Sequence, residues 1–107
     1  MSKKNLPDCP VEVTLSLMGS RWKVLIVREL LIDTRRFSEL KRALSGISQK
    51  VLTEHLRDLE KTGLVDRTVY PEVPPKVEYS LTTLGKSLEP IHQALYDWGT
   101  WYRDNLK

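Results

Sequence analysis

The sequence feature that most constrains the fold is a pair of amphipathic segments separated by one glycine. Apolar residues recur at helical spacing in residues 36–44 and again in residues 48–62. Gly46 separates the two segments, and Ser48 can accept a hydrogen bond from the first turn of the second one. This arrangement predicts a helix-turn-helix.

A β-hairpin is predicted directly after the second segment. Residues 64–70 are rich in β-branched side chains, and residues 77–81 alternate between apolar and polar side chains. Between them, residues 71–75 contain three prolines, which forbid regular structure. A two-stranded hairpin after a helix-turn-helix is the arrangement called a winged helix.

Two further helices are expected before this unit and one after it. Pro10 suits the first turn of a short helix, and Ser20 can cap a second, largely buried helix. A last helix begins at residues 82–83, runs nearly to the C-terminus and bends at Pro90, where an internal proline removes a backbone hydrogen bond. The predicted fold class is therefore mainly α with a small β-hairpin wing.

Length and composition indicate one soluble domain. The chain has 107 residues, of which 40% are hydrophobic and 29% charged, enough for one compact core. We expect a single domain over residues 1–107, with residues 1–8 as a flexible tail and residues 83–107 as a C-terminal helix. No apolar run is long enough to span a membrane, and residues 1–10 lack the hydrophobic centre of a secretory signal. These observations predict a cytoplasmic protein.

Positive charge is concentrated in one part of the chain. The formal net charge is +3, and residues 35–61 alone contain seven basic and four acidic residues. A local basic excess suits a surface that faces phosphates, because Lys and Arg that displace counterions supply most of the sequence-independent affinity for duplex DNA. By itself, such an excess marks an ordinary solvated face more often than a nucleic-acid surface.

The order and spacing of several motifs identify a family resemblance. Residues 9–98 resemble the HxlR-type winged helix-turn-helix transcriptional regulators, a bacterial group related to the MarR-type regulators. Asp33-Thr34 departs from the Gly-Pro that this family often has in the same loop. The resemblance is carried by Cys9-Pro10, Gly19, Trp22, Arg36-Phe37, Gly46-Ile47-Ser48, Lys50, Leu52, Leu56, Gly63-Leu64-Val65, Arg67, Tyr70-Pro71, Pro74-Pro75, Val77-Glu78-Tyr79, Leu81-Thr82 and Gly85.

In this fold the second helix of the motif enters the major groove of DNA, which makes four of its polar residues candidates for base contacts. Lys50 and Arg57 can donate to guanine, Gln49 can pair with adenine, and Thr53 can touch a thymine methyl group. Ser48 can cap the helix, donate to a phosphate, or do both.

The remaining charged residues near the motif have simpler expected roles. Glu54 can accept from a cytosine amine or form an intrahelical ion pair with Lys50 or Arg57, and we favour the ion pair. Arg36 and Lys76 are expected to contact the DNA backbone, where positive charge positions a protein without reading sequence. Lys76 can also be an ordinary solvated lysine in a turn.

The last helix has a regular apolar seam whose partner the spacing does not identify. It can pack on its own domain or on a second copy of the chain, and its length favours the second copy. The resemblance implies a homodimer formed by the first and last helices, and a two-fold dimer implies a pseudo-palindromic operator in double-stranded DNA. The candidate interface residues are Leu88, Ile91, Leu95, Trp98, Trp101 and Tyr102.

Cys9 is the single cysteine and precedes the first helix. The helix dipole favours its thiolate and Lys3 and Lys4 can help, whereas Asp8 opposes ionisation. The resemblance implies a sensor of oxidants or electrophiles, and the alternative is a structurally neutral thiol. A sensor would work by alkylation, by a mixed disulfide with a small thiol, or by a bond between subunits.

Other functional classes find little support in the sequence. His55 and His92 are the only histidines, no catalytic triad or glycine-rich phosphate loop is present, and the histidines share no ligand-like spacing with Cys9. We therefore expect no enzyme, no metal and no cofactor. The main alternative to a DNA-binding regulator is a winged helix used only as a protein-interaction module.

Overall fold

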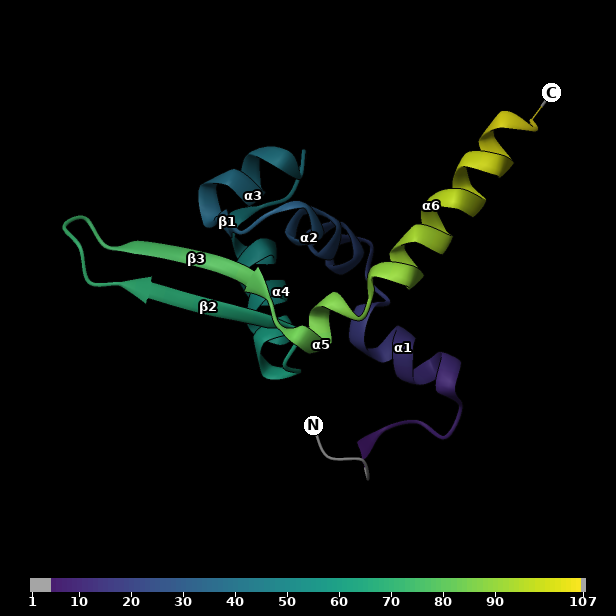
Figure 1. Ribbon diagram of the computed structural model, residues 1–107, viewed down its shortest axis with the longest axis horizontal. Coiled ribbons are helices and arrows are strands. Elements are labelled where there is room, and N and C mark those ends of the chain that lie inside the picture. Colours follow the sequence, from purple (N-terminus) through teal and green to yellow (C-terminus); the bar gives the residue numbers. More distant parts are fainter. Residues whose placement is uncertain (1–4, 107) are drawn as a thin grey trace.

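The computed structural model describes residues 5–106, and this range contains six helices and three strands (Figure 1). The hairpin extends from one side of the molecule, and the first and last helices lie on the opposite side. The helices are α1 (Pro10–Met18), α2 (Arg21–Ile32), α3 (Phe37–Ala43), α4 (Gln49–Lys61), α5 (Thr83–Lys86) and α6 (Glu89–Asp104), and the strands are β1 (Arg35–Arg36), β2 (Val65–Tyr70) and β3 (Lys76–Leu81).

The helix starts are determined by local hydrogen bonding. The Ser20 hydroxyl oxygen accepts from the backbone N–H of Trp22 at 3.2 Å, and the Ser48 hydroxyl oxygen accepts from that of Val51 at 3.1 Å. Pro10 lies in the first turn of α1, where its missing N–H costs no hydrogen bond. All three predicted helix starts are confirmed.

The turn between α3 and α4 has the predicted glycine geometry. Gly46 has a φ of +91°, a left-handed conformation that is strained for residues with a Cβ atom. Ile47 is buried immediately afterwards, so the turn is anchored before α4 begins. The predicted helix-turn-helix is confirmed, with α3 and α4 as its two helices.

The sheet has three strands in the order β1-β3-β2, all antiparallel to their neighbours, whereas the sequence predicted only the hairpin of β2 and β3. In the added strand, Arg35 lies opposite Tyr79 and Arg36 lies opposite Glu78. A strand of two residues contains no alternation, so the sequence pattern could not reveal it.

The hydrophobic core lies between α2, the two helices of the motif and one face of the sheet. Ile26 and Val27 in the middle of α2 are completely buried, which confirms the prediction of a buried second helix. The buried apolar residues are Met18, Ile26, Val27, Leu30, Leu40, Leu44, Ile47, Leu52, Leu56, Leu59, Leu64, Val65, Tyr79, Leu81 and Leu88.

The C-terminal segment differs from the sequence prediction. The expected single helix with a bend at Pro90 is wrong, because α5 ends at Lys86 and α6 begins at Glu89. Pro90 lies in the first turn of α6, where a proline needs no hydrogen-bond partner. Leu88, between the two helices, is 9% exposed and belongs to the core of its own chain. We therefore leave Leu88 out of the candidate dimer surface.

Two sequence expectations concern the ends and the surroundings of the chain. Residues 1–4 of the expected flexible tail, including Lys3 and Lys4, lie outside the described range. Within residues 5–106, no helix is both long enough and apolar enough to cross a membrane.

Candidate nucleic-acid interface

Helix α4 is fixed to the core by one face and leaves the other face open. Leu52, Leu56 and Leu59 are at most 1% exposed and anchor the inner face. Ser48 caps the helix and its hydroxyl oxygen is the acceptor, so its O–H group remains available as a donor. The helix is therefore held rigidly while its outer face stays accessible.

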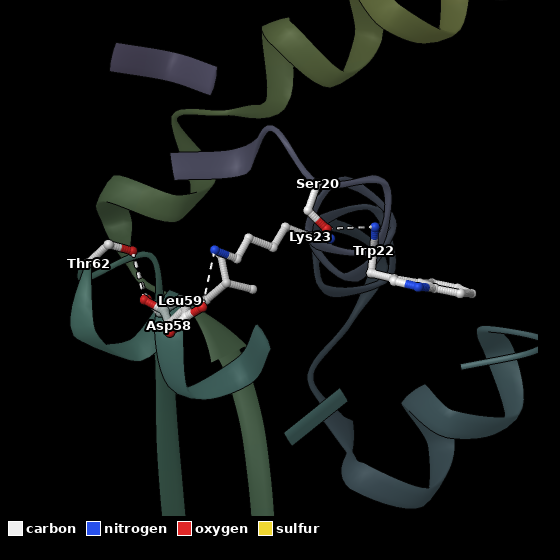
Figure 2. A network of polar contacts seen from close by, with 6 residues as sticks. All are labelled: Ser20, Trp22, Lys23, Asp58, Leu59 and Thr62. Carbon is white, nitrogen blue, oxygen red and sulfur yellow. Dashed lines mark hydrogen bonds and ion pairs between the residues drawn. The ribbon is translucent and has the colours of Figure 1, made fainter. Parts of the chain in front are cut away.

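A second set of contacts ties α4 to the start of α2 (Figure 2). The Lys23 Nζ atom lies 3.4 Å from the Asp58 Oδ2 atom, and Figure 2 shows the lysine side chain reaching from α2 to α4. At the C-terminal end of α4, the Thr62 hydroxyl group donates to the carbonyl oxygen of Asp58 at 3.2 Å. The ion pair fixes the C-terminal half of α4 relative to α2, and the Thr62 hydrogen bond closes the end of α4 itself.

The four candidate base-contacting residues lie together on the open face of α4. A shallow hollow of about 520 Å³ is lined by Gln49, Lys50, Thr53, Glu54 and Arg57. The Thr53 hydroxyl group donates to the carbonyl oxygen of Gln49 at 2.8 Å, so its methyl group is the part left for an outside contact. The structure therefore brings together the residues that the sequence placed on one helix face.

The cations of this face have no acidic partner within the described part of the chain. The ion pairs found in residues 5–106 include neither Lys50 nor Arg57, and the predicted intrahelical pair with Glu54 is not formed. Both cations are exposed. Unpaired cations on an exposed helix face can bind phosphates or base edges without first breaking an ion pair.

A second hollow of about 520 Å³ lies between α4 and the sheet. It shares Gln49, Thr53 and Arg57 with the first hollow, and its other lining residues come from α3, α4 and the hairpin. The lining residues to which the sequence assigned no contact with DNA are Phe37, Leu56, Glu60, Arg67 and Tyr79. The alternation of β2 offered one signal, because Arg67 occupies a position at which an inward-facing apolar residue is expected.

Arg36 and Lys76 lie outside both hollows. Arg36 precedes α3, and its backbone N–H donates to the Glu39 Oε1 atom at 2.8 Å, which leaves its exposed guanidinium group out of the cap. The Lys76 Nζ atom lies 3.6 Å from the Glu78 Oε2 atom and 5.0 Å from the centre of the Tyr70 ring. The charge of Lys76 is thus largely compensated within the hairpin.

The same carboxylate affects the tyrosine of this cluster. Glu78 raises the pKa of Tyr70 above its usual value of 10.0, first by a hydrogen bond to the tyrosine hydroxyl group and second by its negative charge. Tyr70 is therefore neutral at physiological pH, and the cluster of Tyr70, Lys76 and Glu78 carries no net charge.

A different surface, on α6, is apolar and aromatic. The Trp98 and Tyr102 rings stack with their centres 5.3 Å apart, and Trp98 is 63% exposed. The other exposed apolar residues of the predicted seam are Ile91, Leu95 and Trp101, and a hollow of about 420 Å³ is lined by Pro90, Ile91, Ala94, Leu95 and Trp98. Large exposed apolar patches of this kind mark interaction sites.

Cys9 is exposed and stands at the N-cap position of α1. Its side chain makes no capping hydrogen bond, although its carbonyl oxygen accepts from the Val13 N–H at 3.0 Å. The thiol is therefore free to react with a small molecule.

The histidines do not assemble a metal site. No group of three or more His, Cys, Asp or Glu residues within residues 5–106 is arranged to hold a metal ion. His55 and His92 are half-buried, and the Nδ1 atom of each has no hydrogen-bond partner.

Comparison with known proteins identifies the family. The family model of the HxlR-like helix-turn-helix matches residues 17–107. The chain belongs to the HxlR-like helix-turn-helix family. This family assignment confirms the resemblance predicted from the motifs, and the winged helix-turn-helix fold agrees with it.

Relatives in this family are named as transcriptional regulators. The uncharacterized HTH-type regulator YdeP of Bacillus subtilis is 43% identical over 105 residues, which cover 98% of this chain and 82% of YdeP. The uncharacterized HTH-type regulator YkvN of the same organism is 50% identical over 97 residues, covering 91% of this chain and 82% of YkvN. The solved structure of the redox regulator HypR in its reduced form is 46% identical, with a TM-score of 0.86 and coverage of 90% of this chain and 95% of HypR. The chain is accordingly a helix-turn-helix transcriptional regulator.

Proposed function

We propose that this regulator binds operator DNA as a homodimer, with α4 of each subunit in the major groove. The observation that carries the proposal is the open face of α4, where Lys50 and Arg57 are exposed and have no acidic partner among the described residues. A helix that enters the major groove presents base-reading side chains from its N-terminal part. Gln49, Lys50 and Thr53 occupy that part of α4.

Each side chain has a role that follows from its chemistry. We assign Lys50 and Arg57 to guanine and Gln49 to adenine, and the methyl group of Thr53 to a thymine methyl group. Arg36 at the start of α3 and the free O–H of Ser48 are assigned to phosphates, because both lie beside α4 without being part of its base-reading face.

The dimer is proposed to form through α6 together with α1. Both helices lie opposite the hairpin in Figure 1, and both expose apolar side chains, including Val11 and Leu15 on α1 and Leu95 and Trp98 on α6. Burying two such surfaces against their two-fold copies would remove aromatic area from water. The two α4 helices would then read half-sites about one helical turn apart.

The test is selection of bound duplexes from a random DNA library, followed by titration of the best duplex at several salt concentrations. We expect an inverted repeat and an affinity that falls steeply with salt. Lys50→Glu and Arg57→Glu should abolish binding and leave the dimer intact, whereas Lys86→Glu, an equal charge change on α5, should have little effect. Retained DNA affinity in the first two variants would refute the assignment of α4.

The alternative is a winged helix that binds only proteins. Such a module would present apolar or acidic residues where Gln49, Lys50, Thr53 and Arg57 stand. If the wild-type protein enriches no duplex and shows no salt-dependent binding, this alternative replaces the proposal. The proposed activity needs no catalytic step and no cofactor, and it places the protein in the cytoplasm with its operator.

We also propose that Cys9 responds to electrophiles or oxidants. Two observations support this role: the thiol is exposed without a capping hydrogen bond, and the chain is similar to the redox regulator HypR. In an alkylation by an α,β-unsaturated carbonyl compound, the thiol first loses its proton to water. The thiolate sulfur then bonds to the β-carbon, the C=C π bond breaks, and the α-carbon takes up a proton from water. Because α1 belongs to the proposed dimer surface, an adduct at its start would alter the dimer and thereby the spacing of the two α4 helices.

A further inference from the structure

Arg67 lies on the side of the sheet that faces the helices. In the pairing of β2 with β3, Arg67 is directly opposite Tyr79, and directly opposite residues of an antiparallel pair share one face. Tyr79 is 9% exposed and belongs to the core. Val65, two residues earlier on the same face of β2, is also in the core. Arg67, which is itself exposed, thus continues the face of β2 that begins with the buried Val65.

The hollow between α4 and the sheet gives this exposed arginine a concave, solvent-accessible setting. Arg67 from β2 and Arg57 from α4 both line it, so two arginines on different elements border one concave space. Glu60 is the single acidic residue of the lining. Neither arginine is in an ion pair within residues 5–106, so the hollow has an uncompensated positive charge.

The hairpin offers no other free cation near α4. Residues 65–81 contain two basic residues, Arg67 and Lys76, and the ammonium group of Lys76 lies 3.6 Å from the Glu78 carboxylate. The hairpin tip has an acidic Glu72 and a fully exposed Val73 instead of a cation. A phosphate on the hairpin side of α4 would therefore find its positive partner at Arg67 and not at Lys76.

We propose that Arg67 binds one phosphodiester group of the operator backbone in this hollow, which Arg57, assigned to guanine, also borders. The proposal rests on the proposed insertion of α4 into the major groove, because Gln49 and Thr53 border the same hollow and would place the backbone next to it. Arginine suits this task because its planar guanidinium group donates two parallel hydrogen bonds to a phosphate. The contact positions the duplex and reads no base.

A different role for Arg67 follows from the place of β2 at the edge of the sheet. Inward-pointing charges on edge strands prevent edge-to-edge association of sheets. In that role Arg67 protects the monomer from aggregation and leaves the affinity for DNA unchanged. The two roles therefore predict different results for the same substitution.

The experiment compares wild type, Arg67→Gln, Arg67→Lys and the control Lys76→Gln in salt titrations on the selected operator. We expect Arg67→Gln to reduce the slope of log K against log salt by about 0.9 per subunit contact. Equivalently, the affinity ratio of wild type to Arg67→Gln should shrink by about 3.5-fold per contact between about 50 mM and about 200 mM salt. Lys76→Gln should keep the wild-type slope, and all variants should prefer the same operator.

A second measurement locates the phosphate. Duplexes with a single methylphosphonate, which removes one backbone charge, are tested at each position of a half-site. A methylphosphonate at one position should weaken operator binding by the wild type and by Arg67→Lys but not by Arg67→Gln. If Arg67→Gln is poorly soluble, the wild type and Arg67→Lys still locate the phosphate, because Arg67→Lys keeps the charge.

The possible results separate the proposals. Unchanged affinity and slope in Arg67→Gln, with weakened binding in Arg57→Gln, would overturn the role of Arg67 and keep the role of α4. The role of Arg67 would also be overturned if a neutral phosphate at no position weakened operator binding by Arg67→Lys. Absence of salt-dependent binding by the wild type would overturn both proposals together.

Discussion

Lys23 and Asp58 form an ion pair, 3.4 Å from Nζ to Oδ2, that joins the first turn of α2 to the C-terminal half of α4. The lysine side chain is 16% exposed and the aspartate side chain 52%. Because more than half of the carboxylate faces water, the pair contributes little to the overall stability. Its effect is local, since it holds the helix that is proposed to enter DNA.

The first prediction concerns the size of this coupling. In a double-mutant cycle with Lys23→Met and Asp58→Asn, we expect an interaction free energy of about 0.2–1 kcal/mol, measured by urea unfolding. The coupling should shrink in about 1 M salt, because screening acts on partly exposed pairs. The pair of Arg103 and Asp104 serves as the control: both side chains are more than half exposed, so their coupling should be close to zero. Equal interaction free energies in the two pairs would show that the Lys23–Asp58 pair holds α4 no more strongly than an exposed surface pair does.

The second prediction concerns a close backbone approach beside the sheet. A Cβ atom added at Gly85 would overlap the Leu64 carbonyl oxygen, so the backbone at Gly85 or at Leu64 would have to move. We expect Gly85→Ala to lower the free energy of unfolding by about 1–3 kcal/mol. Gly99→Ala is the matched control, because a Cβ there meets no atom within 4 Å in the single chain and alanine favours helix by about 1 kcal/mol. Equal thermal stability of the two variants would show that the backbone around Gly85 can shift with little loss of stability.

The third prediction concerns the proposed dimer. Trp98→Ala should weaken dimerisation by about 2 kcal/mol or more, roughly 30-fold in Kd, because a large aromatic side chain at the centre of an interface contributes most of its energy. Tyr96→Ala is the control, since Tyr96 is also 63% exposed on α6 but lies off the seam. Sedimentation equilibrium measures both dissociation constants. A Tyr96→Ala effect equal to that of Trp98→Ala would place the interface elsewhere on α6.

The sequence predicted those parts of the fold that depend on local chemistry. The caps at Ser20 and Ser48 follow from the preference of a hydroxyl group for free N–H groups, and the turn at Gly46 follows from the absence of a Cβ atom. The exposed face of α4 follows from helical periodicity. Each of these features needs only a short stretch of chain, and each is found in the structure.

The missed features depend on contacts between distant parts of the chain. The two-residue strand β1 exists because Arg35 pairs with Tyr79, 44 positions later in the numbering. Pro90 is compatible with both a bend inside a helix and the start of one, and the burial of Leu88 favours the start. The alternation of β2 places Arg67 on one face of the sheet, but it does not record that this face lies beside α4, which is what brings Arg67 into the candidate site.

The last prediction concerns Cys9. N-ethylmaleimide adds the Cys9 thiol across the C=C bond of its ring: the sulfur bonds to one ring carbon, the π bond breaks, and the neighbouring ring carbon takes up a proton. The adduct adds bulk at the first residue before α1. We expect the adduct to lower operator affinity by about tenfold, equivalent to about 1.4 kcal/mol, because α1 is part of the proposed dimer surface. Cys9→Ser should bind like the untreated wild type and should not respond to the reagent. A fully alkylated wild type, verified by mass spectrometry, that still binds the operator with unchanged affinity would identify Cys9 as a neutral thiol. A loss of affinity with equal dimerisation before and after alkylation would instead show that the adduct acts on DNA binding without acting on the interface.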